Sequence, residues 1–199
     1  MALRGLPHVS RGGTYYRICG PDWEDPSDTQ YSKDFGGRWN ANGSYGALYL
    51  NQNLDGARAN AQRFIANQFG PDILPEDIDP AFLPDAAVFT VESTPFVDAV
   101  TADGRKALGL AVRYAQNAGH AQCQAIGAQA YAAKEDGIAT LSAVTAQSEE
   151  LVVFDRAVKA IVRSGKRTRF AGWYPSAAAA PTQPAPSPRR KRKATQKKR

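Results

Sequence analysis

The composition of this chain changes abruptly after Pro175, and the change confines any packed core to the residues before it. Residues 176–188 read SAAAAPTQPAPSP, with no charge and no large apolar side chain. Such a segment buries too little apolar area to offset the entropy lost on ordering, and its prolines favour extended backbone. We therefore expect one folded domain over residues 10–175, an Ala/Pro-rich linker over 176–188 and a disordered basic tail over 189–199.

The excess positive charge of the chain lies in this tail. Arg189–Arg199 hold eight of the 25 Lys and Arg residues and no acid, so the 17 basic residues that remain are outnumbered by 19 acidic ones. The net charge of +6 is thus a property of the tail, which excludes a uniformly basic nucleic-acid-binding fold. Non-specific contact with nucleic acid through Arg189–Arg199, a solubilising role, and contact with an acidic membrane surface or partner remain alternatives for the tail.

Several other classes of protein are excluded by what the sequence lacks. No run approaches the ~18 apolar residues of a membrane-spanning helix, and the N-terminus has no apolar core of a secretory signal. Two cysteines, Cys19 and Cys123, and two histidines, His8 and His120, lie far apart and match no metal or redox spacing. The sequence therefore predicts a reduced, cytoplasmic domain with no metal and no membrane span.

Alternating strand and helix patterns within the expected domain predict an α+β fold. Runs of β-forming residues predict strands at 14–18, 46–50, 87–92, 137–141 and 151–154. Helical spacing of apolar residues predicts helices at 54–69, 108–115 and 121–134. The segment 21–37 is typical of a long polar loop.

The segment Gly36-Gly37-Arg38-Trp39-Asn40 is the most informative in the chain. Adjacent glycines allow the backbone to approach a ligand closely or to adopt a left-handed turn. Arg38 offers planar donors suited to phosphate or carboxylate, Trp39 a flat wall, and Asn40 an amide that can bond its own turn or a ligand. A ligand-binding loop and a tight turn whose arginine pairs with a nearby Asp are both compatible with these residues.

Ser142 follows a predicted strand, a position that can present a hydroxyl to a cleft. No G-x-S-x-G motif surrounds it and neither histidine has a recognisable place in a triad, which argues against a nucleophilic serine. Hydrogen bonding to a ligand and a plain structural role at the end of the strand are both compatible with its position.

In order and spacing, several segments of the chain resemble the RES domain family, which is named for an arginine, a glutamate and a serine. The segments are Tyr16-Arg17, 36–40, 48–50, 123–127, 137–138 with Ser142, and 151–154, so the resemblance covers about residues 14–170. It implies a compact ADP-ribosyltransferase-like mixed sheet with flanking helices, in a bacterial or phage toxin whose partner is an Xre-type antitoxin. It further implies that NAD+ is the substrate, consumed by hydrolysis, by phosphorolysis or by ADP-ribosylation of a protein.

The resemblance assigns catalytic roles to four positions. The family arginine falls on Arg38, the serine on Ser142, and the tyrosine, which would contact the nicotinamide riboside, on Tyr49. The family glutamate belongs on the helix after Tyr49 and falls on Asn60, with Gln62 the less favoured choice, and neither is an acid. Breaking the nicotinamide–ribose bond develops positive charge on the sugar, which a nearby carboxylate stabilises. Asn60 can hydrogen-bond a ribose hydroxyl but supplies no charge.

The resemblance also assigns contacts with NAD+. Arg17 and Arg38 are expected to grip the pyrophosphate, because guanidinium groups bind phosphate oxygens in pairs. Trp39 and Asn40 are expected to add contacts beside Arg38. Ser142 is expected to hold a ribose hydroxyl or the amide.

The missing acid leaves several functions open. A lost electrostatic group typically costs about 10²–10³ in rate, so we expect a slow enzyme, a non-catalytic nucleotide-binding or interaction module, or rescue by another carboxylate. Glu92, Asp136 and Glu149 lie near predicted strand ends and are candidates for that rescue. A nucleic-acid-associated protein that acts through its basic tail is a further alternative.

Overall fold

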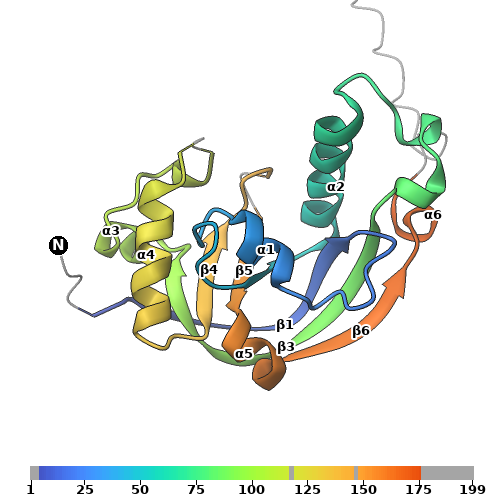
Figure 1. The fold of residues 1–199 in the computed structure, drawn as a ribbon. Coiled ribbons are helices and arrows are strands. Elements are labelled where there is room, and N and C mark those ends of the chain that lie inside the picture. The colour runs from blue at the N-terminus through green and yellow to red at the C-terminus, as the bar shows by residue number, and fades with distance from the viewer. Residues whose placement is uncertain (1–4, 117–118, 146–147, 176–199) are drawn as a thin grey trace, which may run out of the picture.

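A computed structural model describes residues 5–116, 119–145 and 148–175, and within them a six-stranded mixed sheet is flanked by helices (Figure 1). The strands are β1 (His8–Cys19), β2 (Ala47–Asn51), β3 (Asp85–Ala99), β4 (Gly137–Leu141), β5 (Glu149–Phe154) and β6 (Val162–Thr168). The helices are α1 (Gln30–Phe35), α2 (Leu54–Phe69), α3 (Ala102–Ala107), α4 (Ala121–Ala132), α5 (Asp155–Ile161) and α6 (Phe170–Trp173). The predicted α+β class is confirmed, while the expected linker and tail lie outside the described residues.

The sheet closes on itself because its two longest strands, β1 and β3, pair with each other in addition to their shorter neighbours. The strand order is β1-β2-β5-β4-β3-β6, and β1 and β3 pair with each other as well. Their antiparallel ribbon runs from His8 opposite Val97 to Cys19 opposite Asp85. β4 adds to the C-terminal end of β3 in parallel, and the remaining pairs are antiparallel. The short strands β2, β5 and β4 therefore connect β1 back to β3.

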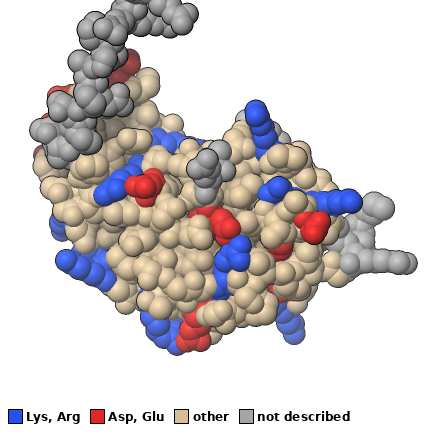
Figure 2. All heavy atoms as spheres, turned by 180° about the vertical axis from the view of Figure 1, so that it is seen from behind, with Lys and Arg blue, Asp and Glu red and all other residues tan. Residues whose placement is uncertain are grey.

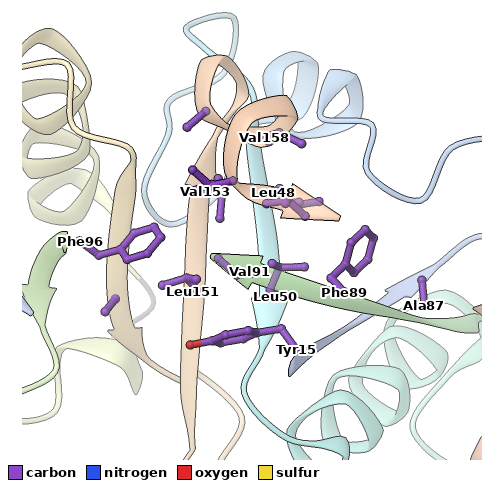
Figure 3. Close-up of a cluster of buried hydrophobic side chains, with 14 of the residues drawn as sticks. Tyr15, Leu48, Leu50, Ala87, Phe89, Val91, Phe96, Leu151, Val153 and Val158 are labelled. Atoms are coloured by element: carbon purple, nitrogen blue, oxygen red, sulfur yellow. The ribbon is translucent and has the colours of Figure 1, made fainter. Parts of the chain in front are cut away.

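Alternate residues of β2 and β5 enter two apolar clusters on opposite faces of the sheet. The first cluster packs against α5 (Figure 3) and includes Tyr15, Leu48, Leu50, Phe89, Leu151, Val153 and Val158. The second packs against α4 and includes Trp39, Ala47, Cys123, Ile126, Val152 and Phe154. Because side chains alternate along a strand, Tyr49 and Glu150 lie on the face of the second cluster and Glu149 on the face of the first.

The predicted helix at 54–69 is confirmed as α2. It begins after Asn53, whose side chain accepts a hydrogen bond from the Gly56 N–H at 2.8 Å, and it ends at Gly70, whose φ of 112° is left-handed. Its buried side is formed by Ala57, Ala61 and Ile65. α2 directly follows β2 and extends beyond the end of that strand (Figure 1). Asn60 and Arg63 both belong to this helix.

The predicted helix at 108–115 is wrong, because the helix of this region ends before it. The Thr101 side chain caps α3 by accepting from the Gly104 N–H at 3.0 Å, and Gly109, with φ 68°, adopts the left-handed conformation that follows the helix. Residues 114–116 form a single 3-10 turn.

Several short elements, among them α1, α5 and β6, were not expected from the sequence. The segment 21–37 contains α1, which has one buried residue and so no apolar stripe. β6 reads VRSGKRT, an edge strand that is mostly exposed, and α5 spans only two turns. β1 and β3 are longer than predicted, because residues 8–11 of β1 pair with residues 94–97 of β3, and the last residues of β3 also pair with β4. β1 begins slightly before the expected domain start at residue 10.

The surface of the described domain has mixed charge. The face shown in Figure 2 carries basic and acidic side chains that are interspersed. This distribution agrees with the near-balance of acidic and basic residues outside the tail. Across the described ranges, no helix combines the length and the apolar character needed to span a membrane.

Candidate active site

A cavity of about 350 Å³ opens where β1, β2 and β5 meet α2 and the segment after α1. This volume is within the usual range of small-molecule sites. The cavity is lined by four of the predicted site residues, Arg17, Arg38, Tyr49 and Asn60. The other three, Trp39, Asn40 and Ser142, are fully buried behind the lining.

Basic side chains from four separate segments line this cavity. Arg17 comes from β1, Arg38 follows α1, Arg63 comes from α2 and His120 precedes α4. Burial, and then the charges of Arg38 and Arg63, lower the pKa of His120, so its imidazole is neutral at pH 7. Three guanidinium groups around one cavity favour an anionic ligand. Arg63 was not predicted, although its position three residues after Asn60 places both on one helix face.

Arg17 is buried and held by backbone carbonyls rather than by a carboxylate. Its Nη1 donates to the carbonyl oxygens of Pro26 at 2.5 Å and Asp28 at 2.9 Å, and its guanidinium carbon lies 5.1 Å from the centre of the Trp23 ring. Burial lowers the pKa of Arg17 to about 10, which leaves the group charged at neutral pH. The carbonyl partners therefore orient the guanidinium without neutralising it.

Two glycines set the path of the backbone that leads to Arg38. Gly36 has a φ of 73°, the left-handed conformation that the sequence left open. A Cβ on Gly37 would lie 2.5 Å from the Tyr49 hydroxyl, so the close approach here is to Tyr49. The Arg38 guanidinium lines the cavity, and its Nη1 donates to the Tyr114 carbonyl at 3.3 Å.

Tyr49 ties this backbone segment to β2. Its hydroxyl accepts a hydrogen bond from the Trp39 N–H at 3.0 Å and donates to Asn40 Oδ1 at 2.8 Å. Burial raises the pKa of Tyr49, so the phenol stays protonated at physiological pH. Tyr49 therefore positions the loop that bears Arg38 in addition to lining the cavity.

Asn40 and Trp39 bind to the protein interior. The Asn40 amide donates to the carbonyl of Ser32 at 2.5 Å and to that of Tyr45 at 3.1 Å. Trp39 packs edge-to-face against Tyr114, with ring centres 5.9 Å apart. These contacts give both residues a role in holding the loop, and their direct contact with NAD+ stays a prediction.

Glu150 is the one carboxylate among the described residues that line the cavity. It lies on β5 opposite Asn51 of β2. Its Oε1 accepts hydrogen bonds from Ser142 Oγ at 2.8 Å and from Asn60 Nδ2 at 3.3 Å. Burial raises the pKa of Glu150, while these two hydrogen bonds and the nearby arginines, Arg38 and Arg63, oppose the rise.

Asn60 of α2 and Ser142, which follows β4, meet at this carboxylate. The Asn60 amide also donates to Asn51 Oδ1 at 2.7 Å, which fixes its orientation. Ser142 is fully buried, and its Oγ lies 3.3 Å from the amide nitrogen of Val144 as the strand ends. Ser142 therefore contacts Glu150 from behind the cavity wall.

The three carboxylates expected to replace the missing acid do not line the cavity, so that expectation is wrong. Glu92 pairs with an exposed arginine, and Asp136 lies beside a threonine of β3. Glu149 pairs with Arg11 at 2.7 Å on the opposite face of the sheet. Glu149 and Glu150 are adjacent on β5, so alternation separates them. The sequence therefore shows that the two glutamates face opposite sides of β5, but it does not show on which side the cavity lies.

The described residues offer no group of three or more His, Cys, Asp and Glu side chains that could hold a metal ion. Cys19 and Cys123 are both buried, and burial raises the pKa of each thiol. Neither is therefore the low-pKa thiolate that nucleophilic catalysis requires.

A family model described as the RES domain matches residues 14–172. The chain belongs to the RES domain family. The match agrees with the resemblance seen in the sequence and contains every predicted site residue, together with Arg63 and Glu150. Arg189–Arg199 lie outside both the match and the described residues, so nucleic-acid contact through them stays a prediction.

The fold of this RES domain is also found among solved structures. It is similar to a chain in the crystal structure of the M. tuberculosis MbcT–MbcA toxin–antitoxin complex, with a TM-score of 0.69 and 20% sequence identity. The similarity covers 81% of this chain and 85% of that chain. No curated protein matches the sequence. The structural likeness supports the predicted mixed sheet with flanking helices.

Proposed function

We propose that this RES domain binds NAD+ in the cavity and breaks its nicotinamide–ribose bond. The observation that carries the proposal is the convergence of Arg17, Arg38 and Arg63, from three distant parts of the chain, on one cavity that also holds a carboxylate. A pyrophosphate-linked dinucleotide has this pattern of charge, with anionic phosphates at its centre and a ribose that becomes cationic as the bond breaks.

Different residues of the cavity serve binding and chemistry. Arg17 and Arg38 hold the pyrophosphate, and Arg63 adds positive charge from α2. Tyr31 is 60% exposed at the cavity and offers a ring against which a base or nicotinamide stacks. Nicotinamide leaves as a neutral molecule, so the site needs no strong general acid. It needs a group that stabilises the cationic sugar.

We extend the proposal to a biological role as the toxin of a toxin–antitoxin pair in the bacterial or phage cytoplasm. Membership of the RES family and the likeness to a chain of the MbcT–MbcA toxin–antitoxin complex support it. An Xre-type antitoxin is the proposed protein partner. Expression without that partner is expected to arrest growth and deplete cellular NAD+.

The direct test is to incubate the purified full chain with NAD+ and follow nicotinamide release. Parallel reactions with and without inorganic phosphate distinguish hydrolysis from phosphorolysis, and mass spectrometry of added cell protein detects ADP-ribosylation. We expect Arg38→Ala to lower kcat/KM by about 10²–10³. Arg163→Ala is the matched control, because Arg163 is exposed on β6 and lies outside the cavity.

The results separate the proposal from its alternative. Wild type that releases no more nicotinamide than Arg38→Ala contradicts the enzymatic function. Tight binding of ADP-ribose without turnover, measured by calorimetry, identifies the non-catalytic nucleotide-binding module instead. That alternative is favoured by Asn60, which is neutral where the resemblance places the family glutamate.

A further inference from the structure

We propose that Glu150 is the catalytic carboxylate of this domain, and that Asn60 and Ser142 are positioning residues that hold it. The inference rests on the proposed cleavage of NAD+ and deepens it by assigning the acid to β5 instead of α2. The sequence comparison with the family does not suggest this residue, because the resemblance places the acid at Asn60.

Glu150 lies at the same cavity as the arginines. Glu150 lines the cavity that Arg17 and Arg38 also line, and it is the carboxylate that does so among the described residues. It is fixed on a central strand of the sheet, with Asn51 of β2 opposite it and Val152 anchored in the second apolar cluster. A carboxylate on a paired strand is held more rigidly than one on a loop, as preorganised electrostatic catalysis requires.

The hydrogen bonds of Glu150 all come from neutral side chains and reach only one of its oxygens. Ser142 Oγ and Asn60 Nδ2 both donate to Oε1, at 2.8 Å and 3.3 Å. No donor from the described residues reaches Oε2, and no ion pair forms with Glu150 inside those residues. A half-buried carboxylate held by neutral donors costs stability, which points to a use for its charge.

Asn60 and Glu150 are in direct contact. Position 60 is where the resemblance places a glutamate, and its side chain touches the carboxylate at position 150. An acid at either position therefore puts its charge in the same part of the cavity, with the other position supplying the hydrogen-bond donor. The site therefore still has one negative charge, although position 60 of α2 carries an amide instead of the family glutamate.

Cleavage of the nicotinamide–ribose bond requires no proton transfer to Glu150. The bond between ribose C1′ and the nicotinamide nitrogen breaks, and its electron pair stays on that nitrogen, so neutral nicotinamide leaves. Positive charge develops on the ribose, and the ionised Glu150 stabilises it. An oxygen of the acceptor then bonds to C1′. Where the acceptor is water, one proton is released to solvent and ADP-ribose is the product.

The experiment compares Glu150→Gln with Glu149→Gln in the full chain. Glutamine keeps the shape of the side chain, and its Oε1 can still accept from Ser142, so the variant removes the charge while an NH2 group replaces Oε2. Glu149 is the matched control, being the adjacent carboxylate on the same strand and facing the opposite side of the sheet. Nicotinamide release gives kcat and KM, calorimetry gives the Kd of ADP-ribose, and thermal unfolding reports the fold of each variant.

We expect Glu150→Gln to lower kcat by about 10²–10³ while the Kd of ADP-ribose changes little, because the arginines still bind the pyrophosphate. Glu149→Gln should keep wild-type kcat. An active wild type whose Glu150→Gln variant keeps its kcat overturns the assignment and leaves the proposed function standing. A wild type without turnover overturns both.

A second variant moves the acid across the contact. The double variant Asn60→Glu with Glu150→Gln restores a carboxylate to the same part of the cavity from α2. We expect its kcat to exceed that of Glu150→Gln by about tenfold or more, because coupled neighbours are not additive. A double variant no more active than Glu150→Gln, although folded and able to bind ADP-ribose, contradicts the exchange between the two positions.

Discussion

Asp85 is buried and Glu150 is half-buried, and the two carboxylates have different partners. Asp85, at the start of β3, is 1% exposed, and its Oδ2 lies 2.8 Å from Arg167 Nε and 3.4 Å from an Arg169 nitrogen. Arg167 also donates to the Gly20 carbonyl at 2.7 Å. Glu150 is held by an amide and a hydroxyl instead, beside a cavity.

The difference separates a structural carboxylate from one available to a ligand. Around Asp85, two arginines neutralise the charge and connect β3 and β6 to the turn that follows β1. Around Glu150, neutral donors orient the group but leave its charge uncompensated by an ion pair within the described residues. Removing the first charge should therefore damage the fold, and removing the second should damage the chemistry.

The largest effect on stability is expected for Asp85→Asn. The substitution leaves Arg167 without its anion in a partly buried position, and we expect the free energy of unfolding to fall by about 2–4 kcal/mol. Denaturant titration measures the loss. The same titration on Glu150→Gln should show no comparable loss, and an equal loss in both variants would remove the distinction between the two carboxylates.

An intermediate effect is expected for Ser142→Ala. The hydrogen bond from Ser142 favours the ionised form of Glu150, so its loss raises the pKa of that carboxyl further above its usual range. The acid limb of the profile of kcat against pH should move to higher pH, with a stability loss of about 1 kcal/mol. Arg38, Arg63 and His120 also line the cavity, so Glu149→Gln, which leaves them in place, serves as the control and should keep the wild-type profile.

The smallest effect is the pH dependence of stability contributed by Glu150 itself. Burial raises its pKa in the folded state, so the folded protein binds the proton more tightly than the unfolded chain. The free energy of unfolding therefore falls as pH rises from about 4.3, the ordinary pKa of a glutamate, to the raised pKa that Glu150 has in the folded state. Glu150→Gln should be slightly more stable than wild type at pH 7. That advantage should disappear in titrations below pH 4, and an advantage that persists there has another cause.

Elements with a clear apolar pattern were predictable, including the short strands β2, β4 and β5, and short elements without one were not. The cap at Asn53 and the stop at Gly70 bracket α2, so residues close in sequence are enough to define it. β6 and α1 lack an apolar pattern, because one is an exposed edge strand and the other buries a single residue. Packing against the rest of the chain decides such segments.

The candidate site shows the same division. The sequence pointed to Arg17, Arg38, Tyr49 and Asn60, and the structure brings these four to one cavity. The sequence did not point to Glu150. Alternation along β5 shows that Glu149 and Glu150 face opposite sides of the sheet, but it does not show which side carries the cavity. Rescue by another carboxylate was one of three alternatives, and the three acids named for it do not line the cavity.

The sequence by itself determined three features: the limits of the RES match, the position of α2 and the glycine-rich segment that leads to Arg38. Each of them depends on residues that are neighbours in the chain. Only the tertiary structure decided that Glu150, Asn60 and Ser142 meet at one oxygen. Their contact requires β5 to pair with β2 on one side and β4 on the other, and strand order and register are set by the packing of both sheet faces.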